Sequence, residues 1–402
     1  MLKSQTKKTG GAKMNLKIIC VEFENLKQFE NQKFRIDFIA SDRVLKKSEL
    51  FKLSSNVATQ NIIGFIGLNA TGKTTSLRLL KTALEIVIRN TDLNSAITSD
   101  LIVDDTIMRT TFFYNNKYHQ LESVIGIHDD TDKFKFYYKK ETLKHKKAST
   151  FYSRTELTDF TNADVENRSD LQNDVAKYLD ESKSIVNPTI KGNNSYISDN
   201  LWMNYANPAV LSGKAPAEIL DVFDDSIEEF SMSKSSSNGE PGEWKLKFKN
   251  DNWIYSGNNT FEPNLLISAG TISGQRLIHE AIIVLKKGGY LLIDELEAHM
   301  NKELIRVILG LFGSTKTNPN GACIIFSTHY VEILDFNILS RKDNIYITRK
   351  KNFLLSVKKF SDDFKRNDFK KSEIILSNLL TGTAPKYEAI ERLRDFVCNQ
   401  VR

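Results

Sequence analysis

Cysteine is scarce in this sequence. The 402 residues include three cysteines, Cys20, Cys323 and Cys398. Three widely separated cysteines are too few for a disulfide framework or a zinc site. The composition therefore excludes the small disulfide-rich classes, and we expect the protein to work in the reducing cytoplasm.

Long hydrophobic runs are also lacking. Apolar stretches such as 281–285 and 290–293 are far shorter than the roughly 18 to 20 residues that a transmembrane helix needs. Residues 1–13 carry lysines that no apolar core follows, so they do not form a secretory signal. We expect these residues to be a disordered basic tail, and we expect no membrane partner.

Neither sign of charge is in strong excess. The 56 basic and 50 acidic residues give a formal net charge of +6, which is too mild to indicate nucleic-acid binding by itself. Hydrophobic residues make up 40% of the chain, enough for a substantial core. The length allows one large domain with an insertion, or two ordinary domains.

The hydrophobic patterns occur in an order typical of α/β proteins. Apolar alternation predicts a β-hairpin in residues 16–38, a buried strand at 61–66 and further β-structure in 106–138. Apolar residues at helical spacing predict a helix over 74–88. After a polar stretch, the sequence predicts a helix over 275–287, a strand (YLLIDE), a helix over 302–312 and a strand (ACIIFSTH).

A phosphate-binding motif lies between the second strand and its helix. Residues 67–74 read GLNATGKT and match G-x-x-x-x-G-K-[ST]. In such a loop the backbone N–H groups surround the β-phosphate, the lysine reaches the β- and γ-phosphates, and the hydroxyl binds Mg²⁺. The alternative is an ordinary glycine turn before a helix, but such a turn would not need a buried strand directly before it. The predicted phosphate-binding residues are Asn69, Ala70, Thr71, Gly72, Lys73, Thr74 and Thr75, and Lys73 also has a catalytic role.

Two carboxylates at the end of a later strand complete the expected nucleotide site. Asp294 follows the apolar residues YLLI and is predicted to bind Mg²⁺ together with Thr74. Glu295 is predicted to activate or orient the water that attacks the γ-phosphate. Asp294 lies more than 200 residues after the loop, so a large segment is inserted between them. The best match to a guanine-reading Asn-Lys-x-Asp, at residues 116–119, ends in histidine, which argues against a GTPase.

At this point the sequence resembles the ABC-type ATPases of the SMC and Rad50 kind. Within them it is similar to ATPases of bacterial phage defence, namely OLD-type ATPase domains and the AbiL-like and RloA-like proteins of the AAA_15/AAA_21 type. The run DELEAHM, residues 294–300, resembles the family motif D-E-x-E-x-H-[LM]. The resemblance implies an α/β fold: an ABC-type P-loop ATPase head with a mixed central sheet, an antiparallel β-subdomain and a small helical insertion.

The resemblance also divides the chain. After the tail, residues 14–144 would be the N-terminal half of the ATPase domain with the phosphate loop. Residues 145–225 would be a helical insertion, too poor in heptads for a long coiled coil. Residues 226–402 would be the C-terminal half with the signature, the acidic strand and the switch histidine.

Further site residues follow from the resemblance alone. It implies a signature at Ser268, Gly270 and Thr271 that contacts the nucleotide of a second subunit, although a competing register reads 273–275 as the signature and a simple helix cap would look similar. It also implies that His329, after an apolar strand, is the catalytic switch histidine. Asn301 stands where some members have an aspartate, and Gln120 is the only nearby candidate for the family's Q-loop glutamine, which we do not assign.

The implied function is an ATPase that binds and hydrolyses Mg-ATP as a head-to-tail homodimer or higher assembly. It would act as a sensor or regulator in an anti-phage, abortive-infection system, with a nuclease or toxin effector in trans, because only 73 residues follow His329. The alternative is a DNA-binding, ATP-driven clamp or repair protein of the RecF or Rad50 type. Two lysine-rich segments, 133–147 and 349–360, leave nucleic acid as a candidate partner, but they favour solvated edge hairpins.

Overall fold

The fold is described from a computed structural model. It describes residues 15–42, 50–128, 135–149, 152–171, 179–201, 213–233, 242–259, 262–298, 300–365, 369–377 and 387–401. The predicted basic tail, residues 1–13, lies outside the described residues, as does His299.

A six-stranded mixed sheet forms the centre of the molecule. Its strands run in the order β10-β15-β16-β5-β17-β18, and all neighbouring pairs are parallel except β17 with β18. Strands β5, β15 and β16 consist of buried residues throughout, as expected for parallel strands covered on both faces. The bounds are β5 (Ile62–Ile66), β10 (Ile197–Asp199), β15 (Tyr290–Ile293), β16 (Cys323–Thr328), β17 (Ile345–Lys351) and β18 (Leu354–Lys359).

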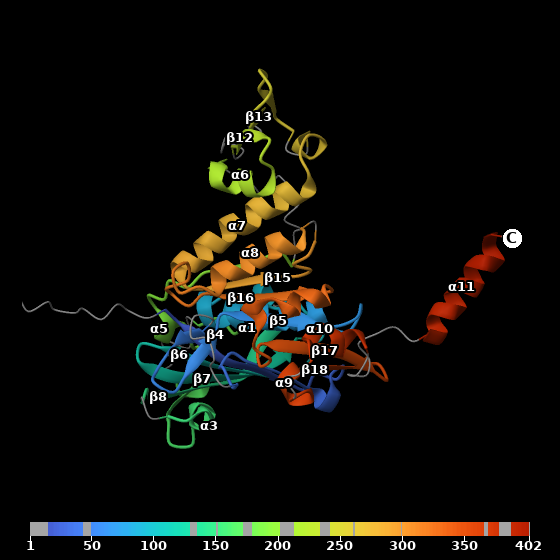
Figure 1. The fold of residues 1–402 in the computed structure, drawn as a ribbon. Helices are drawn as coiled ribbons and strands as arrows, with labels where there is room; N and C mark the ends of the chain where they lie inside the picture. Colours follow the sequence, from blue (N-terminus) through green and yellow to red (C-terminus); the bar gives the residue numbers. More distant parts are fainter. Residues whose placement is uncertain are drawn as a thin grey trace, which may run out of the picture.

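A second, antiparallel sheet lies on the other side of helix α1 (Lys73–Arg89). Apolar residues of α1 share one hydrophobic cluster with both sheets, so the helix is packed between them. This places the layers in the order seen in Figure 1, with β7 and β8 below α1 and the central sheet. The antiparallel strands, in spatial order, are β2 (Lys33–Asp37), β1 (Lys17–Glu24), β6 (Thr106–Tyr114), β7 (Lys117–Ile127), β8 (Phe136–Lys147) and β9 (Asp164–Asn167).

Helices α7 (Ala269–Lys287) and α8 (Lys302–Phe312) cover the opposite face of the central sheet. Above α7, a small lobe has its own apolar cluster (Figure 1). The lobe contains α6 (Ala217–Phe223), β11 (Gly213–Lys214), β12 (Ile227–Met232), β13 (Trp244–Phe248) and β14 (Tyr255–Gly257).

The remaining elements are short, except for the last helix. Strands β3 (Leu50–Lys52) and β4 (Ala58–Gln60) pair with each other. Helix α11 (Tyr387–Val401) has no buried residue and lies apart from the body in Figure 1. The others are η1 (Glu30–Gln32), α2 (Leu93–Ala96), α3 (Arg154–Thr158), η3 (Arg168–Asp170), α5 (Asn187–Ile190), η5 (Glu262–Leu265), η6 (Val331–Asp335), η7 (Asn337–Leu339), α9 (Phe360–Asp363) and α10 (Lys371–Leu376).

The predicted fold class is confirmed by the mixed central sheet and the separate antiparallel sheet. The structure differs from the prediction inside residues 145–225. The described part of this segment contains the short helices α3, α5 and α6, but it also contributes β9, β10 and β11 to three different sheets. The segment is therefore not a separate helical insertion. Its short strands pair within larger sheets, because such short strands are not stable on their own.

The two lysine-rich segments take up different positions. Strand β8 pairs with β7 on one side and β9 on the other, so it is not the edge strand that we expected. The second segment does form an edge hairpin, β17–β18.

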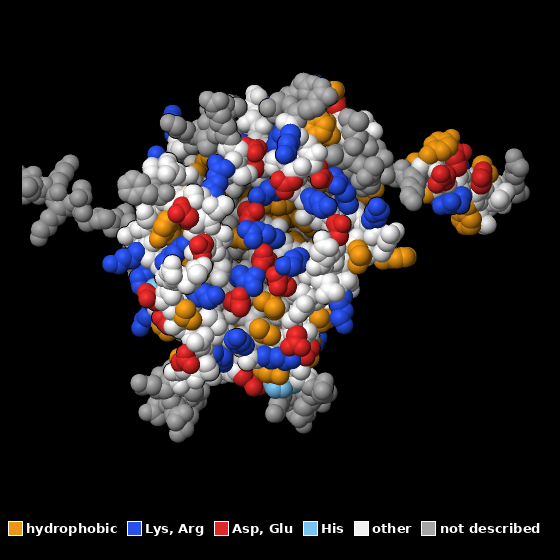
Figure 2. Space-filling model, turned by 90° about the horizontal axis from the view of Figure 1, so that it is seen from below, with side chains coloured by type: hydrophobic (Ala, Val, Ile, Leu, Met, Phe, Trp, Pro, Cys, Tyr) orange, Lys and Arg blue, Asp and Glu red, His pale blue; other side chains and the backbone are white. Residues whose placement is uncertain are grey.

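Basic and acidic side chains are interspersed on the face of the molecule seen from below in Figure 2.

Candidate functional site

The phosphate loop connects β5 to α1. Gly72 precedes the helix with φ 95°, a left-handed conformation that favours glycine. Thr71 is buried, and its hydroxyl bonds the Leu68 carbonyl at 2.7 Å and the Thr348 hydroxyl at 2.7 Å. These bonds brace the loop against β17, and the N-terminal end of a 17-residue helix faces whatever the loop binds.

Lys73 is a buried lysine whose ammonium group lies within the loop. Its Nζ donates to the carbonyls of Gly67 and Leu68, each at 2.9 Å. Burial lowers the pKa of Lys73, while the nearby Asp294, Glu297 and Glu295 act in the opposite direction. Phosphate oxygens are better acceptors for an ammonium group than loop carbonyls, so the side chain is placed to exchange these bonds for a bound phosphate.

The acidic strand meets the phosphate loop directly. The Thr74 hydroxyl donates to Asp294 Oδ2 at 2.6 Å, and the Ser327 hydroxyl donates to Asp294 Oδ1. Asn200 fixes the backbone of the same residue: its Oδ1 accepts from the Asp294 N–H at 2.7 Å, and its Nδ2 donates to the Asp294 carbonyl at 3.0 Å. A hydroxyl and a carboxylate in contact suit Mg²⁺, which keeps most of its waters and takes few protein ligands.

Two further acids and a histidine lie beside this pair. Glu295 has φ 52° and an exposed side chain, and its N–H donates to the Ser327 hydroxyl at 2.8 Å. Its Oε1 is 4.0 Å from His329 Nε2. Glu297 accepts a hydrogen bond from the His329 N–H, while its other carboxylate oxygen is buried without a hydrogen-bond partner. The strand ends of β15 and β16 thus hold three acids and the histidine together.

Several of these residues line one cleft of about 290 Å³. All the predicted phosphate-loop residues line it except Thr71, and Asp294, Glu295 and His329 line it as well. Sequence reasoning missed part of the wall, formed by Gln28, Lys350, Phe353 and Leu355. These four come from the β1–β2 connection and the β17–β18 hairpin, which carry no recognisable motif. Asn200 and Ser327 were missed too, although Ser327 stands two residues before the predicted histidine.

The predicted signature residues lie elsewhere, at the N-terminal end of α7. Ser268 is exposed and caps the helix, its Oγ accepting from the Thr271 N–H at 3.0 Å. Neither Ser268, Gly270 nor Thr271 lines the cleft of the same chain. In the competing register, Ser273 and Gln275 are 4% and 7% exposed, and Thr271 of the first register is 2% exposed, so burial does not separate the two registers.

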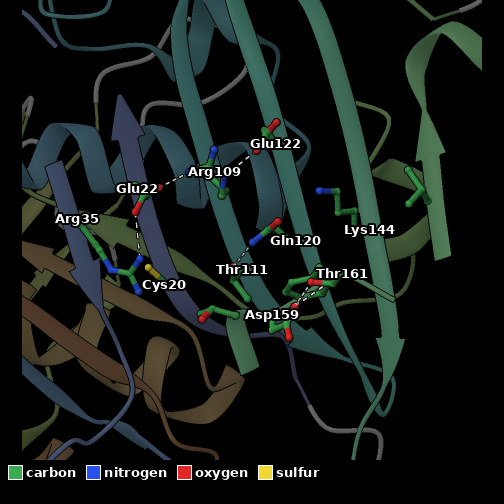
Figure 3. Close-up of a pocket in the computed structure, with 13 residues that line it drawn as sticks. Cys20, Glu22, Arg35, Arg109, Thr111, Gln120, Glu122, Lys144, Asp159 and Thr161 are labelled. Atoms are coloured by element: carbon green, nitrogen blue, oxygen red, sulfur yellow. Dashed lines mark hydrogen bonds and ion pairs between the residues drawn. The ribbon is translucent and has the colours of Figure 1, made fainter. Parts of the chain in front are cut away.

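A second cleft, of about 600 Å³, lies on the outer face of the antiparallel sheet (Figure 3). Cross-strand ion pairs cross its floor, where Glu22 binds Arg35 and Arg109, and Arg109 Nε donates to Glu122 at 2.7 Å. Gln120 lines this cleft and donates to the Thr111 hydroxyl at 3.5 Å. Gln120 is therefore remote from the phosphate loop, and the Q-loop glutamine stays unassigned.

Comparison with known families agrees with this geometry. The AAA_21 family, described as "AAA domain, putative AbiEii toxin, Type IV TA system", matches residues 62–335, more than half of the chain. The chain belongs to this family. The match runs from β5 to η6 and contains the phosphate loop, the acidic strand and His329. No curated protein matches the chain.

Family membership confirms the predicted relationship to defence-type P-loop ATPases and makes this an ATPase-type, nucleotide-binding domain. Among the described residues, no helix has the length and apolar composition needed to cross a membrane. Nor do the described histidines, cysteines and acids form a group of three or more that could hold a metal ion by themselves.

Proposed function

We propose that the protein binds and hydrolyses Mg-ATP as an ABC-type ATPase, acting as a head-to-tail dimer that regulates a separate effector in an anti-phage system. The observation that carries the proposal is the hydrogen-bonded contact of Thr74 with Asp294 beside Lys73, in a cleft that Glu295 and His329 also line. The proximity of these residues, which are far apart in the sequence, supports a site for ATP hydrolysis.

Each group has a role in the reaction. Lys73 and the N-terminal end of α1 would neutralise the phosphates, and Thr74 with Asp294 would hold Mg²⁺, which balances the charge on the β- and γ-phosphates. Glu295 would orient the attacking water and accept its proton as the new P–O bond forms and the bond to the leaving ADP oxygen breaks. His329 would donate a hydrogen bond to the γ-phosphate, because its ring lies on the same cleft.

The position of Ser268 supports the dimer. A serine hydroxyl and the first amides of a 19-residue helix suit a phosphate, yet in the described structure they do not line the cleft of their own chain. A second copy would bring its Ser268, Gly270 and Thr271 to the γ-phosphate. Hydrolysis would then require two chains.

The effector would be a nuclease or toxin on another chain. The family description refers to a type IV toxin–antitoxin system, which supports a partner component. Nucleotide state would decide whether the effector is held or released.

The three cysteines form no disulfide, which suits a cytoplasmic protein.

The test compares the wild-type protein with Glu295→Gln, measuring mass and ATP turnover with and without Mg-ATP. The variant should bind ATP, turn it over at least about 100-fold more slowly, and accumulate as a dimer or higher assembly. Glu303→Gln is the matched control, because Glu303 is an exposed glutamate on α8 outside the cleft. Wild-type turnover in the Glu295 variant, or assembly that ignores nucleotide, would contradict the proposal.

A DNA clamp of the RecF or Rad50 type is the second candidate. The exposed lysines of the β17–β18 hairpin, Lys350, Lys351 and Lys358, favour it. Duplex DNA should then stimulate ATP turnover, and the stimulation should fall steeply as salt rises, because phosphate contacts release counterions. Turnover that is insensitive to DNA at low salt would leave the defence ATPase as the better account.

A further inference from the structure

One wall of the nucleotide cleft has no counterpart in the phosphate-binding motif. It consists of Gln28 from the β1–β2 connection and of Lys350, Phe353 and Leu355 from the β17–β18 hairpin. Lys350 is exposed and forms no ion pair with any described residue. Because the loop and the acidic strand occupy the phosphate end, this wall is the part of the cleft left for the rest of a nucleotide.

The hairpin is fixed relative to the phosphate loop. The Leu355 N–H donates to the Gln28 carbonyl at 2.7 Å, and Phe29 forms a β-bridge with Leu355. The side chain of Leu355 packs against Gly72, where an added Cβ would lie 3.0 Å from Leu355 Cδ1. These contacts of Leu355 place the hairpin beside the phosphate loop.

Phe353 stands at that tip in an unfavourable state. Its side chain is 88% exposed, and its φ is 65°, following Asn352 at φ 49°. Two consecutive positive φ values are typical of a type I′ hairpin turn, in which the second position favours glycine. An exposed aromatic ring in a left-handed conformation is strained and poorly hydrated, so this ring is placed to contact something that the single chain does not supply.

We propose that Phe353 stacks on the base of a purine nucleoside triphosphate bound in this cleft, with Gln28 and Lys350 at the edge of the base and ribose. The inference rests on the proposed ATP site and adds its base-binding element. Phe353 is the only phenylalanine, tyrosine or tryptophan among the described residues that line the cleft. Stacking accepts any base but favours the larger purine face, so the hairpin sets purine preference without reading adenine specifically.

The experiment measures binding by calorimetry with the full-length protein and three probes: Mg-ATP, Mg-CTP and inorganic tripolyphosphate. Phe353→Gly removes the ring and also relieves the strained turn, so the variant should fold at least as stably as wild type. Its affinity for ATP should fall about tenfold or more, while its affinity for tripolyphosphate stays unchanged. Phe353→Trp should retain ATP binding. Leu354→Ala is the matched control, since Leu354 is an exposed apolar residue of the same hairpin that does not line the cleft.

The outcomes separate this inference from the proposed function. If wild type binds neither ATP nor tripolyphosphate, the ATP site itself is wrong. If wild type binds both and Phe353→Gly binds ATP equally well, stacking is wrong while the ATP site stands. Equal loss of ATP and tripolyphosphate in the glycine variant would also overturn stacking, because it would mean general damage to the cleft. If Phe353 serves only dimerisation, the Phe353→Gly monomer would bind ATP like wild type, which would also overturn stacking.

Discussion

At the scale of single residues, Asp294 is the best-supported side chain of the site. Both of its carboxylate oxygens accept hydrogen bonds from hydroxyl groups, one from α1 and one from β16. Its N–H and carbonyl are bound by one side chain, Asn200, which follows β10. A carboxylate held in this way is oriented before any metal arrives, which lowers the ordering cost of binding.

His119 gives a pH prediction. It is 4% exposed, stacks on Phe112, and burial lowers its pKa to about 4. Because the folded-state pKa lies below the unfolded value of about 6.5, the neutral ring contributes stability above pH 6.5 that is lost as pH falls toward 4. The loss should approach 3 kcal/mol. Urea unfolding of wild type and His119→Gln across this range should show the stability difference shrinking with acidity, whereas parallel curves would contradict the assignment.

The sequence predicted the residues that belong to local motifs and missed those brought in by topology. Lys73, Thr74, Asp294 and Glu295 have spacings set by a loop or a strand end, so a single stretch of sequence suffices to find them. Asn200 reaches Asp294 only because β10 adds to the central sheet next to β15. Such contacts depend on the order of strands, which local patterns do not encode.

At the scale of elements, α7 links the small lobe to the central sheet. Its first turns pack in the lobe and its later turns on the sheet. At Gly274 the ring of Phe223 on α6 approaches so closely that an added Cβ would lie 1.9 Å from it.

The hairpins and the long helices were predictable from periodicity. Helix α7, however, begins six residues before the predicted start, because polar Ser268 caps it.

Variants of Ser268 separate a helix cap from a phosphate ligand. Ser268→Ala should lower the free energy of unfolding by about 1 kcal/mol through loss of the cap. Ser268→Asp keeps a good capping residue but introduces a negative charge, so it should unfold like wild type and yet lose ATP turnover about tenfold or more, as expected if a second subunit's phosphate binds there. Thermal unfolding and steady-state turnover measure the two effects. Full turnover in the aspartate variant would mean that Ser268 acts only as a helix cap.

At the scale of the whole molecule, the layers place the cleft at the carboxyl ends of the parallel strands. Asp294 and His329, the residues directly after β15 and β16, line the cleft, and β5 leads into the phosphate loop. Ligands of open α/β sheets bind at this edge. The long sequence gap between Lys73 and Asp294 disappears in space because β5 and β15 are both neighbours of β16.

Helix α11 contributes nothing to this packing. None of its residues is buried, and its apolar side chains are exposed, including Leu393 at 62% and Phe396 at 60%. We therefore expect that ending the chain after Ser377, which removes α11, leaves the thermal unfolding midpoint unchanged. Scanning calorimetry of the shortened and complete proteins measures this directly.

Helix α10 supplies the contrast. Ile374 and Ile375 are buried in the cluster beneath α8, and Lys371 Nζ donates to the carbonyls of Leu334 and Leu339. Ending the chain before Lys371 should lower the unfolding midpoint by several degrees, since burying one such aliphatic side chain is worth about 1.5 to 3 kcal/mol. If removal of α11 alone lowers the midpoint as much, then α11 packs against the body in solution, and its exposed apolar side chains take part in the fold of its own chain.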